Sequence, residues 1–127
     1  MPVQVPTDDE FDKLVSDALE SLPKKYTSKM ENVAIVYADV PNNEERQQAG
    51  LTHPNQTLLG LYQGVPLPAR GGQYKLLPDK ITLYKVPLAM TSKDDHDLKE
   101  NVRHTLWHEM AHYFGLGHKR INELDGR

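Results

Sequence analysis

The segment from His108 to His118 places the strongest constraint on how this chain can fold. It reads His-Glu-x-x-His-x-x-Gly-x-x-His, a spacing typical of zinc sites in which a carboxylate neighbours the first ligand. On an α-helix, His108 and His112 would lie about 40° apart around the axis and one turn along it, so both imidazoles could reach one ion. Gly115 can take a positive φ without steric cost, so a turn there would end the helix and return His118 as a third nitrogen ligand. The motif therefore predicts a helix that ends in a tight turn beside a metal ion.

The residue between the first two ligand positions adds a catalytic element to this pattern. Zinc with three protein ligands keeps one position open for water, which is the arrangement of catalytic rather than structural sites. Glu109 would project about 60–100° around the helix from the two histidines, where it faces that water instead of joining the coordination. We therefore expect a Zn²⁺ site held by His108, His112 and His118, with Glu109 as the catalytic base. The alternative is coincidence, in which these histidines are ordinary surface or core residues.

Length and composition agree with a small enzyme domain. The chain has 127 residues, which suits one domain over residues 1–127 with a single modest core. Its net charge of −3 gives no electrostatic reason to expect nucleic acid or an anionic membrane surface as a partner. No segment approaches the roughly 20 apolar residues of a membrane span, and residues 1–4 lack the pattern of a signal sequence. Because the chain has no cysteine, thiolate ligands are excluded, and a cytoplasmic location is the expectation.

The first two-thirds of the sequence predicts one helix and three strands. Thr7 to Glu10 forms a capping-box pattern, followed by apolar residues at helical spacing until Pro23. Residues 33–37 read as a near-continuously apolar, buried strand, and residues 57–62 and 81–86 read as two more. In the last of these, Ile81, Leu83 and Lys85 would share one face. Residues 41–50 are expected to form a surface loop or short helix, and residues 66–72 a turn-rich loop.

The last long element should begin near Ser92 to Asp95 and run to about Phe114. Its apolar residues span an arc of about 140° that lies nearly opposite the two histidines. One face would thus pack on the sheet or the first helix while the other presents the metal. The apolar residues of this face are Val102, Leu106, Trp107, Met110, Tyr113 and Phe114.

Three segments resemble the small bacterial zincin-like metallopeptidase family: residues 59–67, residues 77–84 and residues 102–115. The resemblance implies an α+β, minimal zincin-like fold. In this fold a short mixed β-sheet of about three to four strands packs against an N-terminal helix and a ligand-bearing active-site helix. It also implies metal ligands at His108, His112 and His118, with Glu109 as the base. The longer motif is similar to that of metzincin proteases, which carry a methionine turn downstream, but residues 119–127 contain no Met.

These features lead us to expect a zinc-dependent metallopeptidase that acts on peptides or unfolded proteins. One alternative is a zinc-dependent RNA hydrolase, because small bacterial endoribonucleases use a similar histidine spacing without the glutamate. Another is a metal-stabilised binding module with little or no turnover. All three would bind zinc, so cleavage of peptides compared with cleavage of RNA would distinguish them.

No second electrophile for the reaction is evident from the sequence. His104 lies one turn before His108, where an exposed helix histidine is the ordinary interpretation. Carboxylates that hydrogen-bond metal-bound histidines commonly orient them, although a solvated terminal turn is the plainer interpretation of Glu123 and Asp125. The side chains that could contribute from the sheet or a loop are Tyr62, Tyr84 and Arg70.

Overall fold

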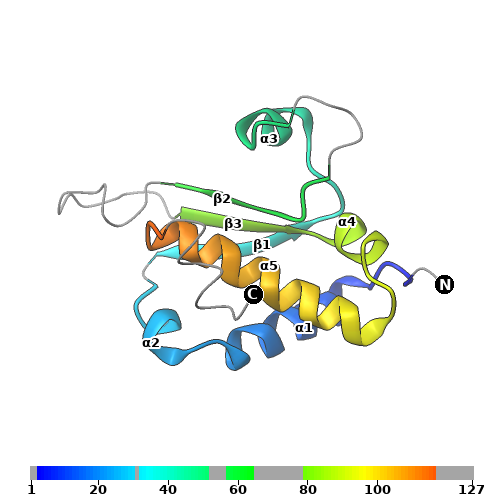
Figure 1. Ribbon diagram of the computed structural model, residues 1–127, viewed down its shortest axis with the longest axis horizontal. Helices are drawn as coiled ribbons and strands as arrows, with labels where there is room; N and C mark the ends of the chain where they lie inside the picture. The colour runs from blue at the N-terminus through cyan, green and yellow to red at the C-terminus, as the bar shows by residue number, and fades with distance from the viewer. Residues whose placement is uncertain (1–2, 31, 52–56, 65–78, 117–127) are drawn as a thin grey trace.

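The computed structural model describes residues 3–30, 32–51, 57–64 and 79–116. Helices precede, separate and follow the strands along the chain, and the described strands form one small mixed sheet (Figure 1). The elements are α1 (Asp8–Ser21), α2 (Lys24–Thr27), β1 (Val33–Ala38), α3 (Asn43–Gln48), β2 (Gly60–Gln63), β3 (Asp79–Tyr84), α4 (Lys85–Met90) and α5 (Asp95–Tyr113). This arrangement confirms the predicted α+β class with a minimal zincin-like fold.

The sheet has the strand order β1-β3-β2. Strand β1 pairs in parallel with β3, from Val33 opposite Asp79 to Ala38 opposite Tyr84. Strand β2 pairs antiparallel with β3, from Gly60 opposite Leu83 to Gln63 opposite Lys80. The central strand β3 is therefore hydrogen-bonded on both sides, which explains why almost all of its residues are buried.

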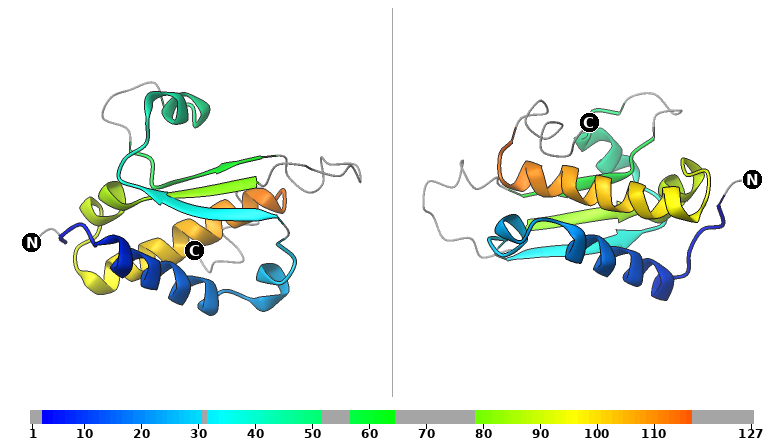
Figure 2. Two further views of the ribbon diagram at one scale, coloured as in Figure 1. Left: turned by 180° about the vertical axis from the view of Figure 1, so that it is seen from behind. Right: turned by 60° about the horizontal axis from the view of Figure 1, so that its bottom comes forward.

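Helices α1 and α5 lie side by side against one face of the sheet, whereas α3 stands apart from them (Figure 2). Helix α1 begins with the predicted capping box, in which Thr7 and Glu10 each accept a backbone N–H of the other. Helix α5 begins at Asp95 behind the N-cap Asp94, close to the predicted start. The core between the helices and the sheet contains Phe11, Val15, Ala18, Leu22, Ile81, Leu83, Leu88, Leu98, Val102, Leu106, Trp107, Met110 and Ala111.

Two strand predictions need correction. The strand at residues 33–37 is not buried, since β1 is half-buried and Val36 is 37% exposed. Among the described strands β1 has only β3 as a neighbour, so an apolar run here marks an edge strand. The third strand ends at Tyr84, and Lys85 and Val86 already belong to α4. Pro87 favours this change because proline is tolerated in the first turn of a helix but not in a paired strand.

The remaining sequence predictions for the fold are close to what is observed. The segment at residues 41–50 contains the surface helix α3, which has no buried residue. The predicted turn at residues 66–72 lies outside the described residues. None of the helices within those described ranges is long and apolar enough to cross a membrane.

Candidate functional site

Helix α5 carries the motif on its last two turns and ends as the sequence predicts. Gly115 has a φ of 72°, and its N–H donates to the carbonyl of His112 at 3.0 Å. The N–H of Leu116 donates to the carbonyl of Ala111, also at 3.0 Å. These two bonds form a Schellman motif, which turns the chain sharply after Phe114. The turn that the motif requires after the second histidine is therefore present.

The buried face of α5 fixes the direction of the two histidines. Val102, Leu106 and Met110 are completely buried in the core, while His108 and His112 are half-buried. The rest of the predicted apolar face behaves similarly, except that Phe114 is only partly buried and packs edge-on against the rings of Tyr26 and Tyr113. Opposite the core, the ring centroids of His108 and His112 lie 4.8 Å apart, with an angle of 56° between the ring planes. Two neutral imidazoles at this spacing form a donor pair of the kind that zinc accepts.

The third predicted ligand, His118, lies outside the described residues, as do the candidate residues Arg70, Glu123 and Asp125. Within residues 3–30, 32–51, 57–64 and 79–116, no group of three or more His, Cys, Asp or Glu residues could hold a metal ion. The donor chemistry of His108 and His112 fits zinc, and completion of the ligand set by His118 stays a prediction.

Glu109 is turned toward the sheet and is only 7% exposed. Its Oε1 atom accepts the backbone N–H of Tyr62 in β2 at 2.9 Å and lies 3.7 Å from Nδ1 of His112. Burial raises the pKa of Glu109 to about 7, and the hydrogen bond from Tyr62 opposes part of this rise. A carboxyl group whose pKa lies near neutrality can both accept and return a proton at neutral pH.

Strand β2 supplies two side-chain contacts behind the carboxylate. The hydroxyl of Tyr62 donates to Oδ2 of the fully buried Asp79 at 2.6 Å. The ring of Tyr62 also packs edge-on against Tyr113 of α5, with centroids 6.3 Å apart. Tyr62 was a candidate electrophile on sequence grounds, but its hydroxyl is engaged by Asp79. Asp79 itself was missed, although a charged residue two positions before the predicted apolar strand at residues 81–86 was a visible signal.

The other two candidate electrophiles within the described residues, Tyr84 and His104, differ in how far they are buried. Tyr84 is completely buried, so its hydroxyl cannot touch a substrate in this conformation. Burial raises the pKa of Tyr84 above its usual range, and the carboxylates of Glu45 and Glu109 raise it further. His104 is half-buried on α5, one turn before His108. The charge of Glu109 thus raises the pKa of Tyr84 through space, but Tyr84 stays buried and does not line a site that a substrate could enter.

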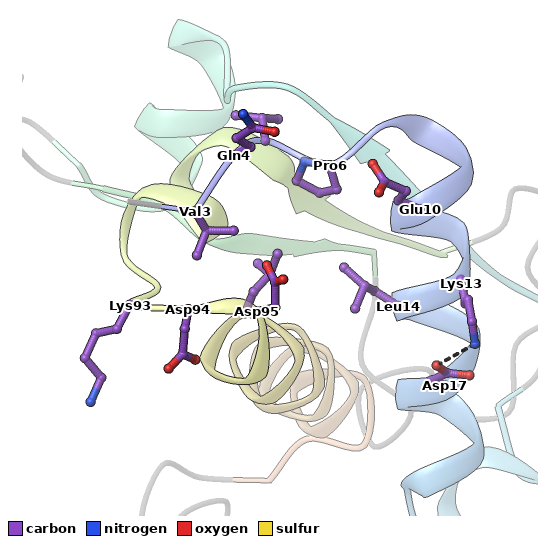
Figure 3. A pocket seen from close by; sticks show the side chains of 12 residues that line it. Val3, Gln4, Pro6, Glu10, Lys13, Leu14, Asp17, Lys93, Asp94 and Asp95 are labelled. Atoms are coloured by element: carbon purple, nitrogen blue, oxygen red, sulfur yellow. Dashed lines mark hydrogen bonds and ion pairs between the residues drawn. The ribbon is translucent and has the colours of Figure 1, made fainter. Parts of the chain in front are cut away.

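A cavity of about 780 Å³ lies at the opposite end of α5 (Figure 3). It is lined by the segment before α1, by α1 and by the start of α5, with an ion pair between Lys13 and Asp17 at its side. Asp94 at this end and His108 at the other are separated by about 21 Å of helix, at about 1.5 Å per residue. This cavity is therefore separate from the histidine motif.

Comparisons with known proteins identify a solved structure with a similar fold and a matching protein family. A solved structure, described as a conserved hypothetical protein from Thermus thermophilus, is similar to this chain with a TM-score of 0.57. It is 21% identical in sequence, and the match covers 95% of this chain and 99% of that one, so it supports the fold alone. No curated protein matches this chain significantly. Residues 30–127 match the profile of the zincin-like metallopeptidases, and the chain therefore belongs to the zincin-like metallopeptidase family.

Proposed function

We propose that this protein is a zinc-dependent peptidase in which His108, His112 and His118 hold the metal and Glu109 is the general base. The observation that carries the proposal is the position of Glu109, a buried carboxylate beside the ring of His112 and hydrogen-bonded to β2. Family membership supports hydrolysis of peptide bonds as the reaction class. The half-buried pair of His108 and His112 supports zinc as the metal.

Zinc bound by the three histidines would supply Lewis-acid chemistry, making water more acidic and the scissile carbonyl more electrophilic. The protein itself would contribute the transfer of one proton by Glu109. Because Oε1 of Glu109 is engaged by the N–H of Tyr62, we assign proton transfer to Oε2. Glu109 would take the proton from the attacking water and pass it to the leaving amine.

Extended peptides are the proposed substrates, because a strand with an unpaired edge beside the site can bind them through main-chain hydrogen bonds. Strand β3 cannot take this role, because it is the central strand and is already paired on both sides. Strand β2 has only β3 as a partner among the described strands. Its outer edge adjoins Glu109 through Tyr62, so an extended peptide added there would lie beside the proposed base.

The test is cleavage of a peptide pool by the zinc-loaded protein and by its Glu109→Gln variant, read by mass spectrometry. Glutamine keeps the size of the side chain but cannot take a proton at neutral pH, so cleavage should fall by about 10²–10⁴-fold while zinc stays bound. Cleavages common to both proteins identify contaminants. Equal cleavage by the two proteins would overturn the role of Glu109.

Structured and unstructured RNA should be incubated in parallel with the same preparations. Cleavage of RNA but not of peptides would overturn the peptidase proposal in favour of an RNA hydrolase. Full zinc occupancy without cleavage of either polymer would instead identify a metal-stabilised binding module.

A further inference from the structure

Strand β2 approaches helix α5 unusually closely at Gly60. A Cβ atom at this position would lie 2.8 Å from Cγ2 of Thr105, 3.2 Å from the carbonyl oxygen of Thr82 and 3.3 Å from Cδ2 of Leu83. The first of these distances is too short for any side chain. Gly60 is therefore required for space, because it lets the strand backbone lie directly against the helix.

A second contact between the same elements is the hydrogen bond from the N–H of Tyr62 to Oε1 of Glu109, 2.9 Å long. The two contacts match in spacing. Thr105 and Glu109 are one helical step of four residues apart, about 6 Å along the axis. Gly60 and Tyr62 are two residues apart on the strand, about 6.6 Å. The close approach at Gly60 and the hydrogen bond at Tyr62 therefore depend on the same placement of β2 along α5, which we call the register of β2.

The far end of β2 is fixed by the buried carboxylate of Asp79. Oδ2 of Asp79 accepts the hydroxyl of Tyr62 at 2.6 Å, and the backbone N–H of Asp79 donates to the carbonyl of Asn32 at 2.9 Å. The chain passes so close to this carboxylate at Gly64 that an added Cβ would lie 2.4 Å from its Cγ. Asp79 thus holds the side chain of Tyr62 and lies close to the backbone of Gly64, directly after β2.

We propose that Gly60, Tyr62 and Asp79 are positioning residues that set the orientation of the Glu109 carboxylate through the register of β2. This inference rests on the proposed function of Glu109 as general base. The amide of Tyr62 holds Oε1 and thereby leaves Oε2 as the oxygen that exchanges the proton. A shift of β2 by a few tenths of an ångström lengthens the hydrogen bond and frees the carboxylate to rotate.

The test is a rescue experiment on the zinc-loaded full chain. Gly60→Ala should push β2 away from Thr105 and lower kcat by about 10–10²-fold, the cost typical of a misplaced catalytic group. Zinc content should stay unchanged, because the histidines are held by α5. Adding Thr105→Ser removes the Cγ2 atom that the new methyl group meets and should restore most of kcat. Thr105→Ser alone completes the double-mutant cycle.

Two further variants separate positioning from general damage to the sheet. Tyr62→Phe removes the hydroxyl that Asp79 holds and should also lower kcat. This variant tests the proposal independently if Gly60→Ala fails to fold. Gln48→Ala is the matched control, because the side chain of Gln48 in α3 also contacts β2, but it accepts a hydrogen bond from Gln63 and has no contact with the Tyr62–Asp79 pair. An equal loss of kcat in Gln48→Ala would overturn the assignment of Tyr62 and Asp79.

The second readout does not depend on activity. The amide proton of Tyr62 should be shifted downfield and protected from exchange in the wild-type protein, as expected for a donor to a carboxylate. Both properties should be lost in Gly60→Ala and in Glu109→Ala, and regained in Gly60→Ala/Thr105→Ser. An amide signal that does not respond to these changes would overturn the positioning proposal. If the amide responds but no variant cleaves peptides, the register is supported and the peptidase proposal fails.

Discussion

The Nδ1 atom of His112 lies 3.7 Å from the Oε1 atom of Glu109, three residues earlier on the same helix. This distance is too long for an ordinary hydrogen bond but places one nitrogen of the imidazole ring on the side of the carboxylate. The proposed ligand His112 and the proposed base Glu109 therefore lie next to each other on α5, as the proposed mechanism requires.

The first prediction concerns the metal. The protein should bind one zinc ion per chain, with distances of about 2.0–2.1 Å to the histidine nitrogens. His108→Ala, His112→Ala and His118→Ala should each lose most of the zinc after mild chelation, because two ligands cannot fix the geometry. His96→Ala is the matched control, since His96 is exposed on the same helix and far from the motif. The measurement is metal analysis by mass spectrometry, and stoichiometric zinc in His118→Ala would show that another residue is the third ligand.

The second prediction concerns the glycine beside Asp79. Gly64→Ala should lower the free energy of unfolding by about 1–3 kcal/mol, because the new Cβ would overlap the buried carboxylate. Gly50→Ala is the control, since Gly50 also has a positive φ but has no atom within 4 Å of the added Cβ. Its cost should be limited to backbone strain, about 1–2 kcal/mol. Urea unfolding of both variants measures the difference, and a larger loss for Gly50→Ala would contradict the contact.

The third prediction concerns the cap of α1. Thr7→Ala removes the hydroxyl that accepts the N–H of Glu10, and should lower the free energy of unfolding by about 1 kcal/mol. Thr7→Ser keeps the acceptor and should be close to wild type. Both variants can be compared by urea unfolding, and equal stability of the alanine and serine variants would argue against a contribution from the cap.

The fourth prediction concerns alkaline pH. Burial raises the pKa of Tyr84 above that of an unfolded tyrosine, so the unfolded chain loses this proton first as the pH rises. The contribution of neutral Tyr84 to the free energy of unfolding is complete below about pH 10, and it is lost as the pH rises through the folded-state pKa. Lys85 acts in the same direction, since its hydrogen bond to Asp8 raises its pKa.

Tyr84→Phe should therefore weaken the decline in stability above pH 10. The slope of unfolding free energy against pH should become shallower by up to about 1.4 kcal/mol per pH unit. Urea unfolding of wild type and variant between pH 8 and roughly pH 11 measures this slope. Identical slopes in the two proteins would mean that Tyr84 does not titrate abnormally in the folded state.

The sequence predicted those features that depend on neighbouring residues. The start of α5 near Asp95 and its end before Gly115 follow from local capping and turn chemistry, and both are observed. The end of β3 was predicted two residues late, because apolar alternation continues through Val86 after the backbone has become helical.

The partner of Glu109 could not be predicted in this way. It is a backbone N–H that lies 47 residues away in the chain, and a main-chain group leaves no trace in the residue pattern. Finding it requires the register of β2 on β3 and the approach of β2 to α5, which are set by packing. For His118 the reverse holds. Its role was predicted from the spacing of the motif alone, and the residue lies outside the residues that the structure describes.

The short strand β2 has a consequence for how the protein responds to heat. It has four residues, and among the described strands it is an outer one, whereas α5 is anchored in the core. Outer strands open locally at lower free energy than the elements of the core. Opening of β2 would release Glu109 from Tyr62 while the helix and its histidines stay folded. Warming should therefore abolish turnover before it melts the helices or releases the metal, so that inactivation and unfolding occur at different temperatures.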